Sequence, residues 1–359
     1  MSNPPDHEGA LPPLPAEGLP VYVHDRLVGS LTEDPVEGTT SFAYCPGTPE
    51  RDCVSLVMPT TVAPEEYQGF YGLLAPFGVS LPEGVLREVL VQRFRKHLDL
   101  SDDMTLLRLT GRDGVERVGV GGPVREGVAP ADARPDLIDM AQSPGAAQAL
   151  MAALHTISVP HIGLSGAMPK MSATPIVNND RPGTLLAPRA LIKFDHGREY
   201  AGASLMEYMC LRICAEAGLP VPDLRLSPDG DALTVGRFDY APSGARLGFE
   251  DLCALTGLQP SGKYQGSVEA IFRIVRAYVD PDYQEEDALR LLRLVCLNDI
   301  LRNGDAHLKN FGLLYDHPDR ARLAPAYDVL NTTYFLPHDQ PALPLDIARR
   351  HRTWMRRAR

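Results

Sequence analysis

The sequence lacks the features that mark membrane, secreted and metal-bound proteins. No run of about 18 apolar residues occurs, so no segment is predicted to span a membrane. The first twenty residues hold neither the basic segment nor the apolar segment of a signal peptide. None of the six cysteines forms a CxxC pair, which argues against a zinc site and against a disulfide framework. We therefore expect a cytoplasmic protein with reduced thiols.

Positive charge is also scarce. The chain has 35 Lys and Arg against 46 Asp and Glu, and its formal net charge is −11. This balance argues against nucleic-acid binding by the chain as a whole. The one basic cluster holds six arginines between Arg349 and Arg359. It is either a DNA-facing tail or a solvated chain end, and we favour the second.

The composition and the order of the local patterns predict an α+β protein of several modules. At 359 residues, 44% hydrophobic and 23% charged, the chain is globular and longer than one compact core usually allows. We expect a flexible Pro-rich leader (1–20), an α+β subdomain (21–122), a module of strands and one main helix (135–240), and a mainly helical part (241–359). No internal repeat is found.

Hydrophobic periodicity and turn residues locate the elements within these modules. In the first we expect a hairpin around 24–26, strands at 41–44, 54–58 and 116–120, amphipathic stretches at 64–74 and 83–97, and a short helix capped by Ser101. Further on we expect helices at 135–155, 200–217 and 285–302, and strands at 190–194 and 233–238. The expected apolar faces are Met206, Met209, Cys210, Ile213 and Ala217 on one helix, and Ala288, Leu291, Leu292 and Val295 on another.

The most informative stretch is the segment 303–310, Asn-Gly-Asp-Ala-His-Leu-Lys-Asn, with a second aspartate, Asp328, further on. Phosphoryl transfer on a kinase-type scaffold needs such a set in this order. A carboxylate orients the attacking hydroxyl, an asparagine and a later aspartate hold Mg²⁺, and a lysine offsets developing charge. We therefore interpret Asp305 as the catalytic base, Lys309 as the stabilising lysine, and Asn310 and Asp328 as Mg²⁺ ligands.

A lysine in an apolar strand is the second signal. Lys193 lies in the run 190–194, which predicts a buried strand, and a buried lysine is costly unless it is paired. The lysine that binds ATP phosphates in kinases lies on a strand. Glu207, on the next helix, is either the ion-pair partner of Lys193 or an ordinary solvated glutamate, and the sequence leaves both open.

Taken together, these motifs resemble the HipA-type serine/threonine kinases, the toxin halves of bacterial toxin–antitoxin modules. The resemblance runs from about Val21 to about Asp346 and includes the family's extra N-terminal subdomain. It rests on segments in the family's order: 163–172, 191–193, 207–208 with 218–222, 237–239, 303–310 and 323–329. The family implies a two-lobed, protein-kinase-like fold, with an ATP-binding N-lobe in 135–240 and a helical C-lobe in 241–359.

The resemblance also implies ATP and Mg²⁺ as cofactors and a set of nucleotide-binding residues. The segment 163–172 stands where the phosphate-covering loop is expected, and its glycines allow close backbone approach. Phe238 is expected near the adenine, and Asp239 at the ribose or the lobe junction, with a purely structural role left open for both. The residues expected at the nucleotide are Lys193, Ser165, Gly166, Lys170, Glu207, Phe238 and Asp239.

The family further implies two kinds of partner. One is a small helix-turn-helix antitoxin of the HipB type, which binds DNA as a dimer, so that this acidic chain meets DNA mainly through it. The other is a protein substrate from the translation apparatus, such as an aminoacyl-tRNA synthetase. No membrane partner is expected.

The chain departs from the family pattern at several places. Gly163 stands where an autophosphorylated serine is common, with Ser165 as a candidate substitute, Met168 replaces a glutamine, and Gly236 replaces a hinge glutamate. Relatives continue with further helices beyond the position of Asp346, so a C-terminally truncated C-lobe is expected. Three functions follow: an active kinase, which we favour; an inactive, antitoxin-binding co-repressor scaffold; and, least favoured, a small-molecule phosphotransferase.

Overall fold

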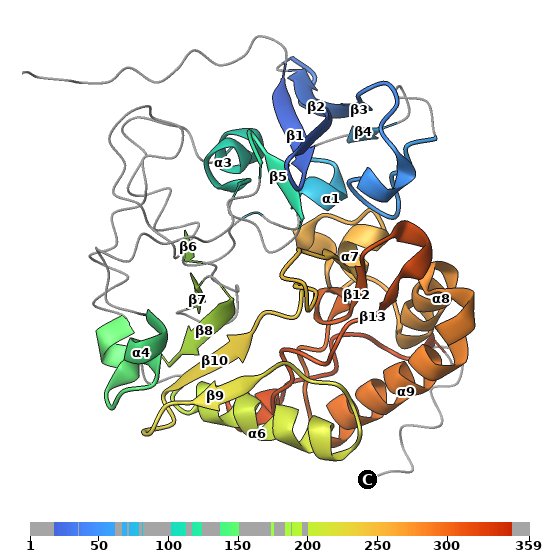
Figure 1. Ribbon diagram of the computed structural model, residues 1–359. Coiled ribbons are helices and arrows are strands. Elements are labelled where there is room, and N and C mark those ends of the chain that lie inside the picture. Colours follow the sequence, from blue (N-terminus) through green and yellow to red (C-terminus); the bar gives the residue numbers. More distant parts are fainter. Residues whose placement is uncertain are drawn as a thin grey trace, which may run out of the picture.

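The computed structural model describes residues 18–34, 36–61, 67–69, 72–78, 81, 102–112, 117–123, 137–150, 174–175, 184–187, 189–195 and 200–346. The strands and the helices come in separate runs along the chain, in agreement with the α+β class that the sequence predicts. The strands form three sheets, each built from its own part of the chain, and all paired strands are antiparallel. Figure 1 shows the first sheet above the helical part, with the second sheet and α6 below it on the left.

The first sheet has the strand order β4-β3-β2-β1-β5. Its strands are β1 (Leu19–Val23), β2 (Arg26–Asp34), β3 (Thr39–Tyr44), β4 (Gln68–Gly69) and β5 (Val118–Val120). The predicted hairpin is confirmed, and His24 in its turn has φ of 53°. Alternate residues of β1 are buried, as expected for a strand with one packed face. Within the stretch 64–74, for which the sequence predicts an amphipathic pattern, the short strand β4 pairs with β3.

Two further expectations for this subdomain need correction. The predicted strand 54–58 is a turn, in which the N–H of Met58 donates to the carbonyl of Ser55 at 3.0 Å. The N-cap of α3 (Asp103–Thr110) is Asp102, not Ser101, because the Asp102 carboxylate accepts from the N–H groups of Met104 and Thr105. A short helix, α1 (Ala75–Gly78), also belongs to this part, and the predicted stretch 83–97 lies outside the described residues.

The second sheet has the order β6-β7-β8-β10-β9. Its strands are β6 (Thr174–Pro175), β7 (Thr184–Ala187), β8 (Ala190–Phe194), β9 (Leu224–Leu226) and β10 (Ala232–Gly236). One face is covered by α4 (Leu137–Ala141). The predicted helix 135–155 is interrupted after α4, because Gly145 adopts φ of 71° and its N–H donates to Asp229. Residues 146–150 are helical again.

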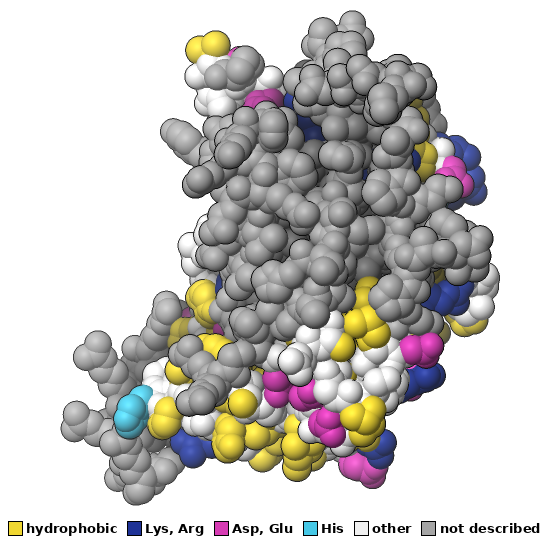
Figure 2. All heavy atoms as spheres, turned by 90° about the vertical axis from the view of Figure 1, so that its left-hand side faces the viewer, with side chains coloured by type: hydrophobic (Ala, Val, Ile, Leu, Met, Phe, Trp, Pro, Cys, Tyr) yellow, Lys and Arg dark blue, Asp and Glu magenta, His cyan; other side chains and the backbone are white. Residues whose placement is uncertain are grey.

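The helix α6 (Ala203–Glu216) packs on β8, β9 and β10. It ends as predicted before Gly218, whose φ is 81°. The apolar face expected for this helix is confirmed at Cys210 but wrong at Met209 and Ile213, which are 51% and 44% exposed, whereas Glu207 is buried. Figure 2 shows hydrophobic side chains along the lower edge of one face, and α6 lies at the lower side of Figure 1.

The third part combines three helices with a small sheet. The helices are α7 (Leu252–Leu255), α8 (Val268–Tyr278) and α9 (Gln284–Ile300). The sheet has the order β11-β12-β13, with β11 (Gly248–Asp251), β12 (Gly312–Tyr315) and β13 (Arg322–Leu323). Short 3-10 turns link these elements: η3 (Pro260–Gly262), η4 (Pro281–Tyr283), η5 (Leu308–Asn310), η6 (Pro318–Arg320) and η7 (Thr332–Tyr334), while η1 (Glu50–Asp52) lies in the first subdomain.

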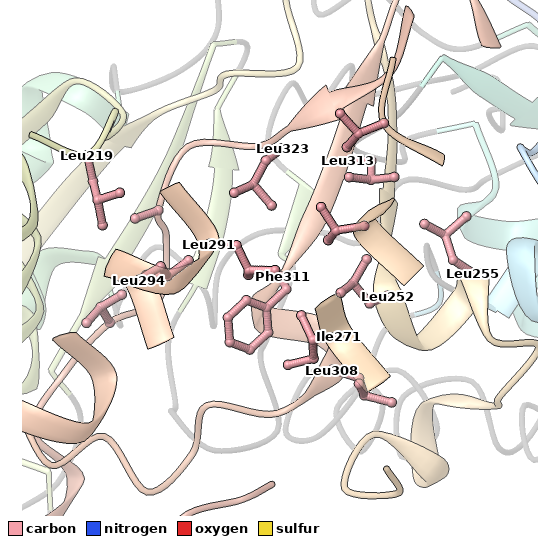
Figure 3. Packing of buried hydrophobic residues seen from close by; sticks show 14 of the residues in the cluster. Leu219, Leu252, Leu255, Ile271, Leu291, Leu294, Leu308, Phe311, Leu313 and Leu323 are labelled. Carbon is pink, nitrogen blue, oxygen red and sulfur yellow. The ribbon is translucent and has the colours of Figure 1, made fainter. Parts of the chain in front are cut away.

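The core of this third part supports the segment 303–310. Leu252 from α7, Ile271 from α8 and Leu291 from α9 converge on Leu308 and Phe311, as Figure 3 shows. Burying a side chain of this size contributes roughly 1.5–3 kcal/mol. Since Leu308 and Phe311 flank Lys309 and Asn310, packing fixes these two polar residues from both sides.

A buried carboxylate joins the first subdomain to the third part. Glu250 in β11 accepts hydrogen bonds from the Ser55 hydroxyl, from the N–H of Leu56 at 2.8 Å and from the Tyr315 hydroxyl at 2.6 Å. Burial raises the pKa of Glu250 above its ordinary value, against the opposing effect of these hydrogen bonds and of Arg117. The strand that leaves the segment 303–310 is thereby tied to the N-terminal subdomain.

No helix among the described residues combines the length and the apolar character that crossing a bilayer requires.

Candidate active site

Three charged side chains meet where the second sheet faces the helical part. The Lys193 ammonium, on β8, lies 2.6 Å from Oε1 of Glu207, on α6, and 2.8 Å from Oδ1 of Asp328. Lys193 lies on β8, the central strand of its sheet, beside Leu233 of β10, and Asp328 follows β13. The contact with Lys193 settles the position of Glu207, which the sequence left open.

Burial makes these contacts strong. The side chains of Lys193, Glu207 and Asp328 are 14%, 1% and 11% exposed. Charges this far from water are costly unless each faces an opposite charge or a hydrogen-bond donor. Among the described side chains, one ammonium faces two carboxylates, an arrangement that a further cation would stabilise.

Asn310 holds the other oxygen of Asp328. Its Nδ2 donates to Asp328 Oδ2 at 2.7 Å, while its Oδ1 accepts from the N–H of His307 at 3.1 Å. Asp328 has φ of 57°, in the left-handed region that aspartate enters more readily than most residues. Asn310 and Asp328, which the sequence analysis paired, therefore lie side by side.

The carboxylate of Asp305 lies in the same loop and is 22% exposed. Its Oδ1 accepts a hydrogen bond from the Tyr264 hydroxyl at 2.9 Å, and its Oδ2 lies 3.9 Å from Nε2 of His307. His307 is buried and packs inside the loop, in keeping with a structural role. Tyr264 lies 41 positions before Asp305, and nothing in the spacing of the sequence indicated it.

Hydrogen bonds shape the start of this loop. After α9 the chain turns at Arg302, with φ of 58°, and the Asn303 amide donates to Oδ1 of Asn298 at 2.7 Å. The N–H of Gly304 donates to the Thr332 hydroxyl at 2.7 Å. Hydrogen bonds thus anchor this polar segment to the helix before it and to the chain after Asp328.

Lys309 and Tyr327 are both half-buried, and the Tyr327 phenol holds the Lys309 backbone. The Tyr327 hydroxyl donates to the Lys309 carbonyl at 2.8 Å. Burial, and then the carboxylates of Asp251 and Asp328, raise the pKa of Tyr327 well above its ordinary value. The phenol therefore keeps its proton and remains a donor at any physiological pH.

Two residues expected at the nucleotide have their own contacts at the lobe junction. The ring of Phe238 lies 5.4 Å from that of Phe249 and 5.5 Å from that of Tyr327. Asp239 is buried, and both of its carboxylate oxygens bond the Arg237 guanidinium, Oδ1 at 2.9 Å from Nε. Of the two alternatives for Asp239, this geometry favours holding the lobe junction over binding the ribose.

The expected phosphate-covering segment lies outside the described residues. Ser165, Gly166 and Lys170 belong to it, as do Gly163 and Met168. Among the described residues, direct contacts join Lys193, Glu207, Asp328 and Asn310, while Asp305 and Lys309 lie in the same loop as Asn310.

The donor set fits Mg²⁺. The described residues contain no group of three or more His, Cys, Asp or Glu side chains arranged for a metal. Mg²⁺, however, is usually held by one or two carboxylates together with waters and substrate phosphates. Asp328 is such a carboxylate, and the Asn310 amide oxygen has a second lone pair beside the one used by His307. These two residues would hold the ion between nucleotide and protein.

Comparison with known proteins gives two family matches. Residues 162–359, more than half of the chain, match the family model of the HipA-like C-terminal domain, and residues 19–120 match that of the HipA N-terminal domain. In fold, the chain is similar to the HipA of Shewanella oneidensis MR-1, solved with HipB and operator DNA. The TM-score is 0.63 at 17% identity, over 90% of this chain and 79% of that one.

Two curated relatives come from Sinorhizobium fredii (strain NBRC 101917 / NGR234), and both are named only as candidate kinases. Y4dM is 27% identical over 294 residues, which cover 76% of this chain and 66% of Y4dM. Y4mE is 30% identical over 162 residues, 42% of this chain and 37% of Y4mE. The chain thus spans less than two thirds of the length of these relatives.

One lobe carries a lysine–glutamate pair, the other carries an asparagine–aspartate pair, and the contact of Lys193 with Asp328 joins them, which defines a protein-kinase-like α+β fold. Within that class, the two family matches and the shared fold identify the group. The chain belongs to the HipA family.

Proposed function

We propose that the chain is an Mg²⁺- and ATP-dependent serine/threonine protein kinase of the HipA type. The observation that carries the proposal is the contact of Lys193 with both Glu207 and Asp328, because kinases require a lysine–glutamate pair and a metal-binding aspartate together. The motif order, the family match and the names of the relatives support the same activity.

The proposed roles follow from position. Lys193 binds the nucleotide phosphates and Glu207 orients it, while Asn310 and Asp328 hold Mg²⁺, which offsets phosphate charge. Asp305 receives the proton as the acceptor oxygen bonds to the γ-phosphorus and the bond to the β–γ bridging oxygen breaks, releasing ADP. Lys309 offsets charge on the transferred group. Ser165, Gly166 and Lys170 remain the residues proposed to face the phosphates.

The proposed partner is a small helix-turn-helix antitoxin of the HipB type, and the proposed role is that of a toxin in a toxin–antitoxin module. The similar Shewanella HipA was solved together with HipB and its operator DNA, which supports such a partner. DNA would then be met mainly through the antitoxin. A cytoplasmic location fits this role, and the family resemblance supports a translation-related substrate, such as an aminoacyl-tRNA synthetase.

Calorimetry with Mg²⁺ and ATP tests the proposal without a known substrate. We expect the chain to bind ATP in an Mg²⁺-dependent manner, and Asp328→Asn to bind it at least about tenfold more weakly, since the metal-binding carboxylate is lost. The matched control is Asp316→Asn, because that carboxylate is 57% exposed and pairs only with a surface arginine in the described structure.

Phosphoryl transfer is then followed with γ-labelled ATP. Binding of ATP that is equally strong in Asp328→Asn would contradict the roles given to this site. A folded chain that binds its antitoxin but no ATP would leave the co-repressor scaffold as the function. Transfer to a small metabolite instead of protein would favour the phosphotransferase alternative.

A further inference from the structure

A phenol from outside the segment 303–310 reaches the proposed catalytic base. The Tyr264 hydroxyl donates to Oδ1 of Asp305 at 2.9 Å. Tyr264 lies in the loop between η3 and α8, so neither the kinase motifs nor the role assignments above include it. A hydrogen bond to an ionised carboxylate is shorter and stronger than one between neutral groups.

The loop that carries Tyr264 is attached to the loop that carries Asp305. The N–H of Leu308 donates to the Lys263 carbonyl at 3.0 Å, and the N–H of Gln265 closes a turn on the Gly262 carbonyl at 2.8 Å. Lys263 is itself only 6% exposed. This hydrogen bond joins the two loops at residues next to Tyr264 and close to Asp305.

The Tyr264 ring is also held from the side. It meets the His307 ring edge to face, with centroids 5.2 Å apart and planes at 77°. The Lys263 ammonium lies 5.1 Å from the centroid of the Tyr264 ring. Tyr264 is nevertheless 47% exposed, so it borders both the carboxylate and the solvent from which an acceptor hydroxyl would arrive.

We propose that Tyr264 is a positioning residue for Asp305, which fixes the rotation of the carboxylate through Oδ1 and presents Oδ2 to the acceptor hydroxyl. The proposal rests on the kinase function proposed above. A carboxylate turns easily about its last bond, and general-base catalysis requires the accepting oxygen within hydrogen-bond reach of the acceptor proton. Tyr264 supplies this constraint from one side, and His307 borders Oδ2 from the other.

The test measures ADP release from Mg²⁺-ATP with water as the acceptor, so that no protein substrate is needed. Four proteins are compared: the wild type, Asp305→Asn, Tyr264→Phe and the control Tyr283→Phe. Phenylalanine keeps the ring against His307 and removes only the hydroxyl. Tyr283 is 42% exposed and precedes the first turn of α9, about 25 Å from the loop by the rise of 1.5 Å per residue.

We expect Asp305→Asn to lower kcat about 100-fold or more, as befits loss of a general base. Tyr264→Phe is expected to lower kcat about tenfold while the KM for ATP and the calorimetric affinity for Mg²⁺-ATP stay at wild-type values. A merely structural role would weaken nucleotide binding as well or reduce thermal stability. Tyr283→Phe should leave every quantity unchanged.

Full kcat in Tyr264→Phe beside an inactive Asp305→Asn would overturn the role of Tyr264 and leave the kinase function standing. A tenfold loss of kcat in Tyr283→Phe as well would also overturn the role of Tyr264. Wild-type activity in Asp305→Asn, or no ADP release from any of the four proteins, would overturn the kinase function and with it the role of Tyr264.

Discussion

The ammonium of Lys193 lies 2.8 Å from the carboxylate of Asp328, although the two residues are 135 positions apart in the chain. One belongs to the second sheet and the other to the part built on α8 and α9. Their contact exists only when both parts hold their native arrangement. The candidate site is therefore sensitive to substitutions that change either charge or the packing behind it.

Glu207→Gln is expected to lower kcat/KM for ATP about 10- to 100-fold. The neutral amide no longer competes for Lys193, which then pairs with Asp328 alone instead of facing the nucleotide phosphates. Steady-state phosphoryl transfer or ADP release measures the loss. Glu216→Gln on the same helix is the control, because its side chain is 80% exposed. Equal activity of Glu207→Gln and the wild type would refute the assigned role.

Asp287→Ala is expected to destabilise the fold by about 3–5 kcal/mol, the cost typical of breaking a buried ion pair. The Asp287 side chain is 0% exposed and accepts from Arg290 at 2.7 Å, from Arg322 at 2.9 Å and from the N–H of Leu323 at 2.8 Å. Urea unfolding at pH 7 measures the change. Asp299→Ala, exposed on the same helix, should stay within about 0.5 kcal/mol of the wild type.

The same carboxylate predicts a pH dependence. Burial alone would raise the pKa of Asp287, but the hydrogen bonds from Arg322 and Leu323 outweigh it and hold the pKa below its ordinary 3.8. A carboxylate with a lowered pKa in the folded state stabilises the fold at pH values above its unfolded-state pKa. This contribution is lost as the pH falls through the folded-state pKa. The stability gap between wild type and Asp287→Ala should thus stay constant from pH 7 to about 5 and shrink below about pH 4. A gap unchanged at pH 3.5 would contradict this assignment.

Periodicity located most elements but misjudged part of the buried face of two helices, for one physical reason. The rotation of α6 is set by Glu207, which turns inward to Lys193 and leaves Met209 exposed. In α9 the buried positions include Asp287 and Asn298, while Leu292, expected inside, is 48% exposed. Hydrophobic patterning assumes that polar side chains face water, and it fails where a polar side chain has a buried partner far along the chain.

The candidate site was predictable where chemistry fixes both residue type and local spacing. Asp305, Lys309 and Asn310 stand close together in one loop, so their grouping needs no tertiary information. Tyr264 carries no such signal, since its contact with Asp305 follows from how the loop before α8 packs. The strand predicted at 54–58 failed likewise, because the distant Glu250 takes the hydrogen bonds of Ser55 and Leu56.

Gly304→Ala is expected to lower kcat about tenfold by displacing the loop before Asp305. A Cβ at this position would lie 2.1 Å from Oδ2 of Asp339, closer than side chains can approach. The obstructing atom ends a side chain, so the double variant Gly304→Ala/Asp339→Ala should recover most of the activity. Gly78→Ala is the control, since its nearest contact would be an ordinary 3.5 Å. If the double variant does not recover activity, the clash with Asp339 is not the cause of the lower kcat of Gly304→Ala.

Glu250→Gln is expected to change how stability depends on pH. Burial raises the pKa of Glu250 above its ordinary 4.5, and burial followed by the nearby Glu250 charge raises that of Tyr315 well above its own ordinary value. A group whose pKa is raised in the folded state makes its full contribution to stability at pH values below its unfolded-state pKa. The contribution is lost as the pH rises through the folded-state pKa. Glutamine cannot ionise, so it escapes this loss.

Chemical denaturation between pH 4 and 8 measures the effect. Wild type and Glu250→Gln should differ little at pH 4, where both side chains are neutral, and the variant should gain relative stability as the pH rises. The Ser55 hydroxyl can rotate to accept from the glutamine amide, so the junction between the N-terminal subdomain and β12 is kept. Glu216→Gln should run parallel to the wild type at every pH. If Glu250→Gln also runs parallel, the carboxylate keeps its charge in the folded protein, and Arg117, whose guanidinium lies 4.7 Å from the Tyr315 ring centroid, is the cation that stabilises it.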